Sequence, residues 1–386
     1  MRGVDVSVQP THPTHPTHPD RRPAGRAHQA RATLARRGAL RALLPPADLV
    51  ALLVTKPVNV RYLTGFSGSY GALLLFHDRT IFLTDRRYEV QAAVEVTGAE
   101  IVMAPSGLVA GVVTVLGNDG DGLGFEPNGL TWGMGQRLRT SLPGRAVVPA
   151  PELVEELRVV KDEEEIATMR EAARIGTEAL AGLLGALRAG MTEREVALDL
   201  ELSMRRLGAD GLAFDPIVAF GEQAAEPHHR PNDRELAAGD FVKLDFGARV
   251  DGYRSDMTRT VVLGRASERQ RELYELVLRA QAAGLAALRP RVVPGEVDRA
   301  CREVVADAGL GDAFVHPTGH GVGLEIHEAP WVRPGAGGSI ASGTPVTVEP
   351  GVYLPGFGGV RIEDLAVVRP GGHELLTTAP KELIEL

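Results

Sequence analysis

Two stretches of this chain each place a pair of acidic residues in apolar, strand-like sequence on either side of a tight turn. In the first stretch, residues 242–262, two such runs flank an Asp-Gly pair at positions 251 and 252, which is a strong hairpin signal. Folding about this turn brings Asp245 opposite, or nearly opposite, Asp256. Like charges facing each other across two strands are destabilising, so this pair predicts a bound cation.

The second stretch, residues 346–364, repeats the arrangement. A turn at residues 355–359 brings Glu349 and Glu363 into near-register. Any one of these acids could be an exposed strand residue, but two hairpins with matched acids are hard to attribute to chance. Four carboxylates and one imidazole suit Mn²⁺, Co²⁺ or Fe²⁺ better than a structural zinc ion. Two such ions about 3.5–4 Å apart activate a shared water for hydrolysis.

A third stretch, HPTGHGVGLEIHE at residues 316–328, holds three histidines. His316 and His320 have the i, i+4 spacing of a zinc-binding helix. Pro317 and the glycines that follow it make a helix very unfavourable here. We therefore expect a loop that leads into a strand, and the partners of these histidines must lie elsewhere in the chain.

Composition excludes several classes of partner. The net charge of −8 argues against nucleic acid or an anionic membrane as the main partner. No apolar run reaches the roughly 20 residues of a membrane span. The single cysteine, Cys301, excludes an internal disulfide framework and fits a reducing compartment, so a cytoplasmic location is expected. Its helical surroundings indicate a buried structural thiol.

The pattern divides the chain into three parts. Residues 1–38 contain the repeat THPTHPTHP and an Arg- and Ala-rich run, and we expect a disordered low-complexity tail outside the fold. Residues 39–150 alternate between strand-like and helical runs and predict an α/β domain. Its expected strands are residues 49–54, 71–76, 80–84, 101–104, 122–126 and 146–148.

Residues 151–386 predict a larger α+β domain. Helical stretches continue to about residue 207, and Thr192 and Glu195 form a capping box within them. Further helices are expected at residues 268–288 and 295–308, followed by the histidine stretch and glycine-punctuated strands.

From about residue 49 to the C-terminus, the sequence resembles the pita-bread metallopeptidases, specifically the Xaa-Pro branch that includes aminopeptidase P and prolidase. The resemblance lies in the order and spacing of NVRYLTGFSGSYGALLL, PHHRPNDRELAAGD, LDFG, GYRSDMTRT, TGHGVGLEIHE, TVEPGVY and GGVRIED. It implies a creatinase/prolidase-like N-terminal domain followed by a pita-bread catalytic domain. It also implies two divalent metal ions, expected to be Mn²⁺, with Co²⁺, Zn²⁺ or Fe²⁺ as alternatives. The implied ligands are Asp245, Asp256, His320, Glu349 and Glu363.

The same resemblance assigns His228, His316 and His327 to the surroundings of the scissile amide. Amide hydrolysis needs a donor to the oxyanion and a proton for the leaving nitrogen, and imidazoles suit both tasks. His229, next to His228, is the alternative at that position. Arg361 is expected to support the metal site or the histidines, and Glu349 to accept a proton from the bridging water.

The expected activity is removal of the residue that precedes proline from proline-containing peptides. An aminopeptidase is favoured over an Xaa-Pro dipeptidase, because the interval 328–348 is short and Arg333 is its only basic residue. A dipeptidase needs such a residue to hold the free carboxylate of its substrate. A non-catalytic binding protein on this fold is a weaker alternative, since such relatives typically lose ligands. By the same resemblance we expect a homodimer.

Overall fold

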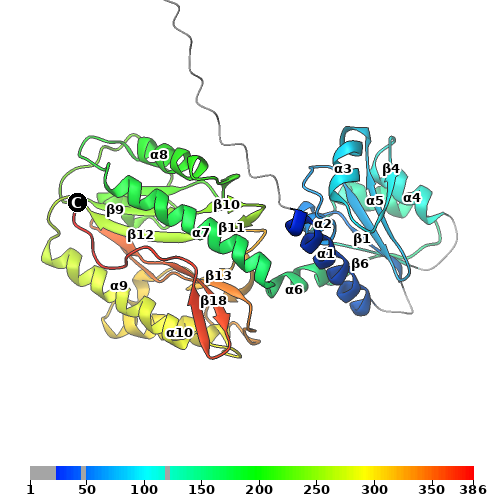
Figure 1. Ribbon diagram of the computed structural model, residues 1–386. Coiled ribbons are helices and arrows are strands. Elements are labelled where there is room, and N and C mark those ends of the chain that lie inside the picture. Colours follow the sequence, from blue (N-terminus) through cyan, green and yellow to red (C-terminus); the bar gives the residue numbers. More distant parts are fainter. Residues whose placement is uncertain (1–22, 45–48, 118–121) are drawn as a thin grey trace, which may run out of the picture. The chain divides into compact units, whose positions relative to one another are not determined.

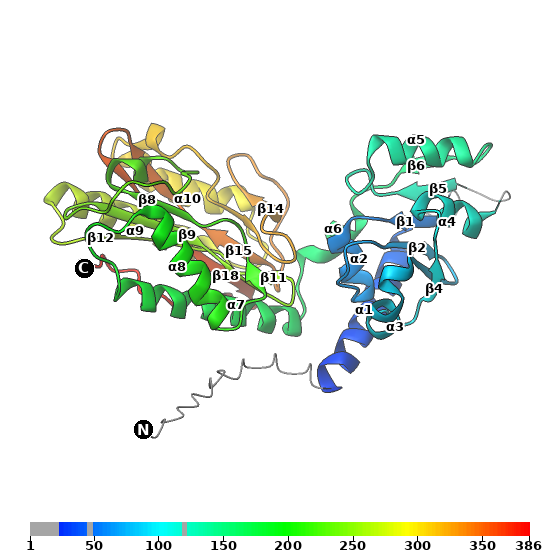
Figure 2. The ribbon, with the colours of Figure 1, turned by 90° about the horizontal axis from the view of Figure 1, so that it is seen from above.

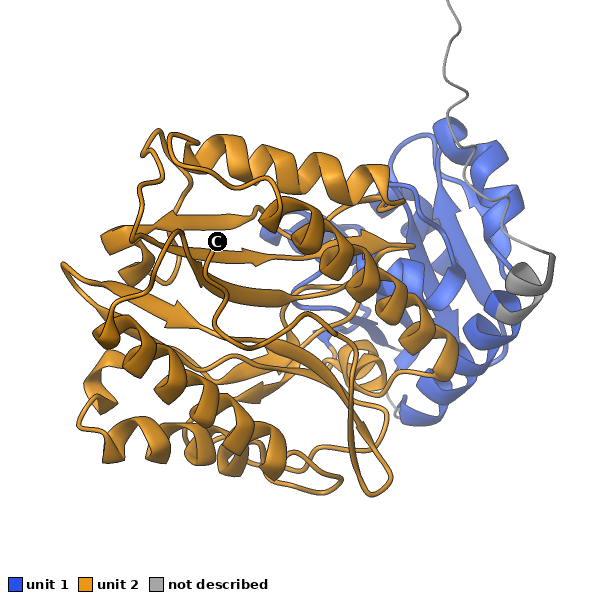
Figure 3. Cartoon of the chain, turned by 60° about the vertical axis from the view of Figure 1, so that its left-hand side comes forward, with its two compact units in different colours: residues 1–149 blue, residues 150–386 orange. Residues whose placement is uncertain are grey.

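The computed structural model describes residues 23–44, 49–117 and 122–386. The chain forms two compact units, Met1–Pro149 and Ala150–Leu386, which are coloured separately in Figure 3. Within the described residues, no helix is long and apolar enough to cross a bilayer.

The first unit is built on one six-stranded mixed sheet with the order β4-β3-β2-β1-β5-β6. The central pairs β1–β2 and β2–β3 are antiparallel, and the outer pairs are parallel. All six strands lie where the sequence predicts them: β1 (Leu49–Val54), β2 (Ala72–Phe76), β3 (Thr80–Thr84), β4 (Glu100–Met103), β5 (Gly122–Phe125) and β6 (Val147–Pro149). The helices of this unit are α1 (Pro23–Leu43), α2 (Pro57–Thr64), the short η1 (Arg86–Tyr88), α3 (Glu89–Glu95), α4 (Leu108–Leu116) and α5 (Trp132–Ser141).

Helix α1 corrects the predicted boundary of the tail. The expectation that residues 1–38 lie outside the fold is wrong for the part that begins at residue 23. Arg37 is 1% exposed and donates from Nη2 to the carbonyl of Thr97 at 2.6 Å, while Leu40 is fully buried. Alanine and arginine are good helix formers, so this run folds once one face can be buried. The THPTHPTHP repeat lies outside the described residues.

The second unit packs two pairs of helices against antiparallel strands (Figures 1 and 2). α7 (Glu163–Leu184) and α8 (Glu193–Arg206) share one apolar core with β8 (Ile217–Phe220), β9 (Phe241–Phe246) and β12 (Met257–Val262). α9 (Glu268–Ala287) and α10 (Pro294–Asp307) share another with β15 (Pro345–Val348), β16 (Gly351–Leu354) and β17 (Gly358–Arg361). The predicted helices and the Thr192/Glu195 capping box are confirmed.

The remaining elements complete the sheets of this unit. β13, β14, β15, β18 and β19 form a five-stranded sheet in the order β14-β13-β15-β18-β19. The other elements of this unit are α6 (Leu153–Val159), β7 (Gly211–Leu212), η2 (Gly221–Ala225), β10 (Ala248–Val250), β11 (Tyr253–Arg254), η3 (Gly311–Ala313), β13 (Gly319–Gly321), β14 (Glu328–Val332), β18 (Asp364–Arg369) and β19 (Gly372–Leu375). The histidine stretch contains the strand β13 and no α-helix, as predicted.

The first acidic hairpin turns at the predicted Asp-Gly pair. Asp251 and Gly252 have φ values of 48° and 82°, the left-handed backbone that a tight hairpin turn of this kind requires. The strand register pairs Asp245 with Thr258, two residues beyond Asp256. The two aspartates are therefore diagonal neighbours rather than direct partners.

The second hairpin is interrupted where its acids lie. β15 pairs with β18 through Val348 and Asp364, and β16 pairs with β17 through Gly351 and Arg361. Both pairings share one register, and it sets Glu349 opposite Glu363 in the short break between them. At such a break the backbone ladder no longer constrains the strands, and both carboxylates can turn toward one side.

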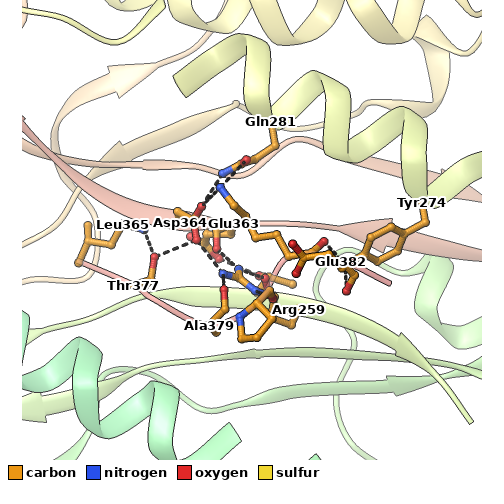
Figure 4. A network of polar contacts seen from close by, with 12 residues as sticks. Arg259, Tyr274, Gln281, Glu363, Asp364, Leu365, Thr377, Ala379 and Glu382 are labelled. Carbon is orange, nitrogen blue, oxygen red and sulfur yellow. Dashed lines mark hydrogen bonds and ion pairs between the residues drawn. The ribbon is translucent and has the colours of Figure 1, made fainter. Parts of the chain in front are cut away.

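A buried ionic network anchors the strand that follows Glu363 (Figure 4). Arg259 on β12 donates from Nη2 to Asp364 Oδ1 at 2.8 Å and to the carbonyl of Ala379 at 2.8 Å. Gln281 and Lys381 each donate to Asp364 Oδ2 at 2.8 Å. Burial alone would raise the pKa of Asp364, but Arg259 and Lys381 outweigh it and lower that pKa. The carboxylate therefore remains charged inside the protein.

Cys301 on α10 is buried, as predicted. Burial raises the pKa of its thiol to about 12. It lies against Gly284 of α9, where an added Cβ would come within 2.4 Å of the sulfur. The thiol thus fills the contact between two helices.

We predict that Arg259→Met lowers the free energy of unfolding by about 3–5 kcal/mol, because it removes the more deeply buried of the two cations that face the carboxylate of Asp364. Arg170→Met is the matched control. Its partner is Glu374 on β19, and the two side chains are 46% and 35% exposed. Such a surface pair contributes about 0–1 kcal/mol. Urea unfolding of both variants measures the difference, and equal losses would contradict the assigned role of the buried network.

Candidate active site

All nine residues predicted for the site line one cavity of about 330 Å³ in the second unit. They come from β9, β13 and β17 and from residues that lie between the strands of this unit. Apolar side chains complete the walls, among them Phe214, Ile217 and Trp331. The cavity therefore combines a charged floor with apolar walls, which is the usual composition of a small-molecule or peptide site.

The carboxylates gather around one imidazole. His320 Nε2 lies 3.3 Å from Glu349 Oε1 and 3.6 Å from Asp256 Oδ2. Atoms of Asp256, His320 and Glu363 that could ligate a metal all lie within 4.8 Å of one another. Three of the four predicted acids thus lie around His320. The fourth, Asp245, lines the same cavity and is ion-paired with Arg361.

The backbone selects the tautomer of His320. Its Nδ1 lies 3.0 Å from the carbonyl oxygen of Gly321. A carbonyl can only accept a hydrogen bond, so Nδ1 carries the proton. When the ring is neutral, Nε2, which faces the carboxylates, keeps its lone pair. This is the arrangement that orients a histidine ligand toward a metal ion. Burial opposes protonation of His320, but its hydrogen bond to Glu349 outweighs this and raises its pKa.

The charges of this group call for a cation. Burial, together with repulsion from neighbouring carboxylates, raises the pKa values of Asp256 and Glu363 well above their usual range. Burial opposes ionisation of Glu349 as well, but its hydrogen bond to His320 outweighs this and lowers its pKa to about 2. Glu363 Oε1 is buried and has no hydrogen-bond partner among the described residues. A hard divalent cation would satisfy this oxygen and relieve the repulsion, so the donor set fits a metal.

Arg361 is buried beside the site and forms hydrogen bonds with three side chains there. Its Nη2 donates to Asp245 Oδ2, its Nη1 to Tyr353 Oη at 2.6 Å, and its Nε to Thr258 Oγ1 at 3.0 Å. Thr258 Oγ1 in turn donates to Glu363 Oε2 at 2.7 Å. The predicted supporting position of Arg361 is therefore accompanied by two residues that the sequence analysis did not assign, Thr258 and Tyr353. Both lie inside quoted motifs, and the signal available was a polar side chain on a buried strand.

His316 belongs to a hydrogen-bonded chain that starts at Arg361. Its Nδ1 donates to the carbonyl of Pro317 at 2.7 Å, so its Nε2 accepts from Tyr353 Oη at 2.7 Å. Burial lowers the pKa of His316 to about 4. This imidazole is neutral near pH 7, and both of its nitrogens are engaged, which suits holding Tyr353 better than delivering a proton.

The adjacent histidines 228 and 229 point to different surroundings. His228 is exposed and lines the cavity. His229 is buried, and its ring nitrogens each lie 2.7 Å from a carboxylate, Glu193 at Nε2 and Glu226 at Nδ1. His229 does not line the cavity. The predicted preference for His228 as the site residue fits this placement.

His327 lies across from His320 at the mouth of the cavity. The two ring centroids are 4.4 Å apart, edge to face. On its other side, His327 stacks on Trp331 with 6.0 Å between centroids. Burial lowers the pKa of His327, and the neighbouring His320 lowers it further.

Both units match known protein families. Residues 167–370 match metallopeptidase family M24, and residues 36–160 match the creatinase/prolidase N-terminal domain. The uncharacterized peptidase YqhT of Bacillus subtilis is 41% identical over 90% of this chain and 99% of its own length.

Two solved structures are similar over both units. The Xaa-Pro dipeptidase from Bacillus anthracis is 40% identical with a TM-score of 0.88, covering 92% of this chain and 100% of that one. The X-Pro aminopeptidase from Thermotoga maritima is 33% identical with a TM-score of 0.83, covering 88% and 98%. The predicted fold, an α/β N-terminal domain followed by a pita-bread α+β domain, is confirmed.

We predict that saturating Mn²⁺ raises the melting temperature above that of the chelated protein. At 100 times its Kd, a ligand bound only to the folded state stabilises it by about 2.7 kcal/mol. Glu363→Gln should reduce this rise, because it removes one ligand charge. In chelator the same variant should cost little, because it also removes a buried carboxylate. Calorimetry with EDTA and with Mn²⁺ tests both statements, and identical melting curves in the two conditions would refute the metal site.

Proposed function

The chain belongs to metallopeptidase family M24, and on that premise we propose that it hydrolyses the bond between an N-terminal residue and proline. The proposed substrates are short peptides with proline in second position. The proposed metal centre holds two divalent cations through Asp245, Asp256, His320, Glu349 and Glu363, with Mn²⁺ as the expected metal.

One observation carries this proposal. Five ligand-type side chains meet in one cavity, and the buried Oε1 of Glu363 lacks any hydrogen-bond partner among the described residues. Two cations in such a site supply Lewis acidity and an activated water. The full donor set also argues against the alternative of a non-catalytic binding protein, which would have no need to keep it.

The chain's own residues divide the remaining tasks. Glu349 lines the cavity with its Oε1 3.3 Å from His320 Nε2, and we assign it to accept a proton from the attacking water. His228 and His327 face the cavity and serve as donors to the oxyanion and the leaving nitrogen. A proline nitrogen has no N–H of its own, so it must be protonated as it leaves. His316 and Arg361 hold Tyr353 and Asp245 in place.

The relatives favour a dipeptidase. The sequence-based preference for an aminopeptidase gains less support, because the solved dipeptidase is the more similar of the two structures compared, at 40% against 33% identity. We therefore propose Xaa-Pro dipeptides as the first substrates to test.

A specific observation keeps the aminopeptidase as a second candidate. Among the described residues that line the cavity, Arg361 is the only lysine or arginine, and its Nε, Nη1 and Nη2 are already engaged. Arg333 is exposed and does not line the cavity. Among the described residues, no unengaged arginine or lysine in the cavity could bind the free carboxylate of a dipeptide. A longer peptide has no carboxylate at that position and needs no such residue.

We further propose a cytoplasmic homodimer. The cytoplasmic location is supported by the single, buried cysteine, which needs no oxidising compartment. The dimer is supported by resemblance to the Xaa-Pro branch alone. Light scattering measures whether the 41.1 kDa chain is paired in solution.

We predict that Glu349→Gln lowers kcat by about 10²–10⁴-fold, as removal of a general base typically does. His327→Ala should also lower kcat, yet leave the bound metal unchanged in elemental analysis. The chelated wild-type enzyme should be inactive and recover with Mn²⁺ or Co²⁺. Full turnover in metal-free enzyme would overturn the proposed function.

We predict that peptide length distinguishes the two specificities. A dipeptidase gives a higher kcat/KM for an Xaa-Pro dipeptide than for the matching Xaa-Pro-Yaa tripeptide, and an aminopeptidase gives the reverse. Arg333→Ala is the informative variant, because its exposed position predicts an unchanged ratio. Loss of dipeptide preference in Arg333→Ala would show that this residue reaches the substrate after all.

A further inference from the structure

His327 faces the substrate cavity without a hydrogen bond to hold its ring. The other histidines of this stretch are fixed through Nδ1, His316 by the carbonyl of Pro317 and His320 by that of Gly321. No described residue forms a hydrogen bond with the imidazole of His327. Its ring contacts are with His320 and with Trp331, which is itself 42% exposed. The position of this imidazole therefore depends on how firmly its backbone is held.

Glu328, the next residue, fixes the backbone of His327. Glu328 is the first residue of β14, and it is paired with Gly321, the neighbour of His320. Its Oε1 accepts the backbone N–H of Glu325 at 2.8 Å, which closes the turn that contains His327. The side chain of Glu328 is 6% exposed, whereas His327 is open to the cavity. Adjacent residues thus serve as an anchor and as a cavity-facing group.

Two buried cations grip the carboxylate of Glu328. Lys161 Nζ donates to Oε2 at 3.0 Å, and Arg158 Nη2 donates to Oε1 and, at 2.9 Å, to Glu325 Oε2. The side chains of Lys161 and Arg158 are 2% and 3% exposed. Burial would raise the pKa of Glu328, but the two cations outweigh it and lower that pKa. Glu328 is thus held by two cations, one of which also binds Glu325.

Close packing leaves this clamp little freedom. A Cβ added at Gly323 would lie 2.8 Å from both Glu328 Oε2 and the Cε of Lys161. The carbonyl of Gly323 also accepts the backbone N–H of Arg254 at 3.0 Å. The turn between β13 and β14 is therefore fixed at its start, at its middle and at Glu328.

We propose that the Arg158–Lys161–Glu328 cluster is a positioning device that sets His327 against the scissile bond. The cations come from α6 and from the link between α6 and α7, elements that contribute nothing to the cavity lining. The inference rests on the role of His327 in the proposed function. A purely structural ion cluster would stabilise the fold without acting through one histidine, and this difference can be measured.

The test is a double-mutant cycle on the metal-loaded, full-length enzyme with an Xaa-Pro peptide as substrate. Glu328→Gln keeps the side-chain shape and removes its charge. It should lower kcat by about 10–100-fold, since small misplacements of a reacting group cost this much. KM and metal content should stay within about 2-fold of wild type. In the His327→Ala background, Glu328→Gln should change kcat by less than about 2-fold, because coupled residues are not additive.

Lys161→Met supports the same cycle if Glu328→Gln does not fold, since it leaves Arg158 and the amide of Glu325 on the carboxylate. Arg170→Met, which breaks an exposed ion pair of the same unit, is the control and should leave kcat unchanged. Equal losses of kcat in the wild-type and His327→Ala backgrounds would overturn the positioning role, as would a Glu328→Gln enzyme with full kcat. Wild-type kcat in His327→Ala itself would instead remove His327 from the proposed function.

Discussion

The crowding of four carboxylates around His320 is the constraint on which this catalytic unit depends. Such a group is unfavourable in a buried cavity unless positive charge lies nearby. The protein provides part of that charge through Arg361, whose guanidinium contacts Asp245. The remainder is left to a cation, as the unpartnered oxygen of Glu363 indicates. Fold and chemistry are therefore linked, because the donor set that costs stability is also the one that fits a metal.

Around this centre, buried ion pairs brace the strands and turns that carry the ligands and histidines. Asp364 follows the ligand Glu363 and is gripped by Arg259 on β12. Glu328 follows His327 and is gripped by Arg158 and Lys161. In both places the residue next to the cavity-facing side chain points into the protein and is neutralised there. Glu363 and His327 each immediately precede a strand, and the first residue of that strand, Asp364 or Glu328, makes the buried ion pairs that hold it.

The metal centre does not determine which peptide length the protein prefers. In the proposed function, the metal site and the histidines serve the scissile amide, whichever residue follows the proline. Length preference depends instead on what meets the far end of the peptide. The cavity has apolar walls, and the one arginine that lines it among the described residues is already engaged. The two similar structures differ in the same property, since one is named a dipeptidase and the other an aminopeptidase.

Much of this protein was determined by local sequence. The Asp251-Gly252 turn and the shared register of the second hairpin depend on nearest neighbours, so the paired acids could be predicted without a structure. The strands of the first unit and the Thr192 capping box follow from local periodicity in the same way.

Tertiary structure alone decided which polar groups meet across long separations. Helix α1 was missed because its Ala- and Arg-rich run looks like tail sequence until one face is buried. The contacts of Arg361 with Asp245 and of Lys161 with Glu328 join residues more than 100 positions apart, which periodicity cannot detect. The sequence alone thus determined which residues could form the site. Long-range packing decided how each would be held, since burial and charge pairing depend on neighbours from distant parts of the chain.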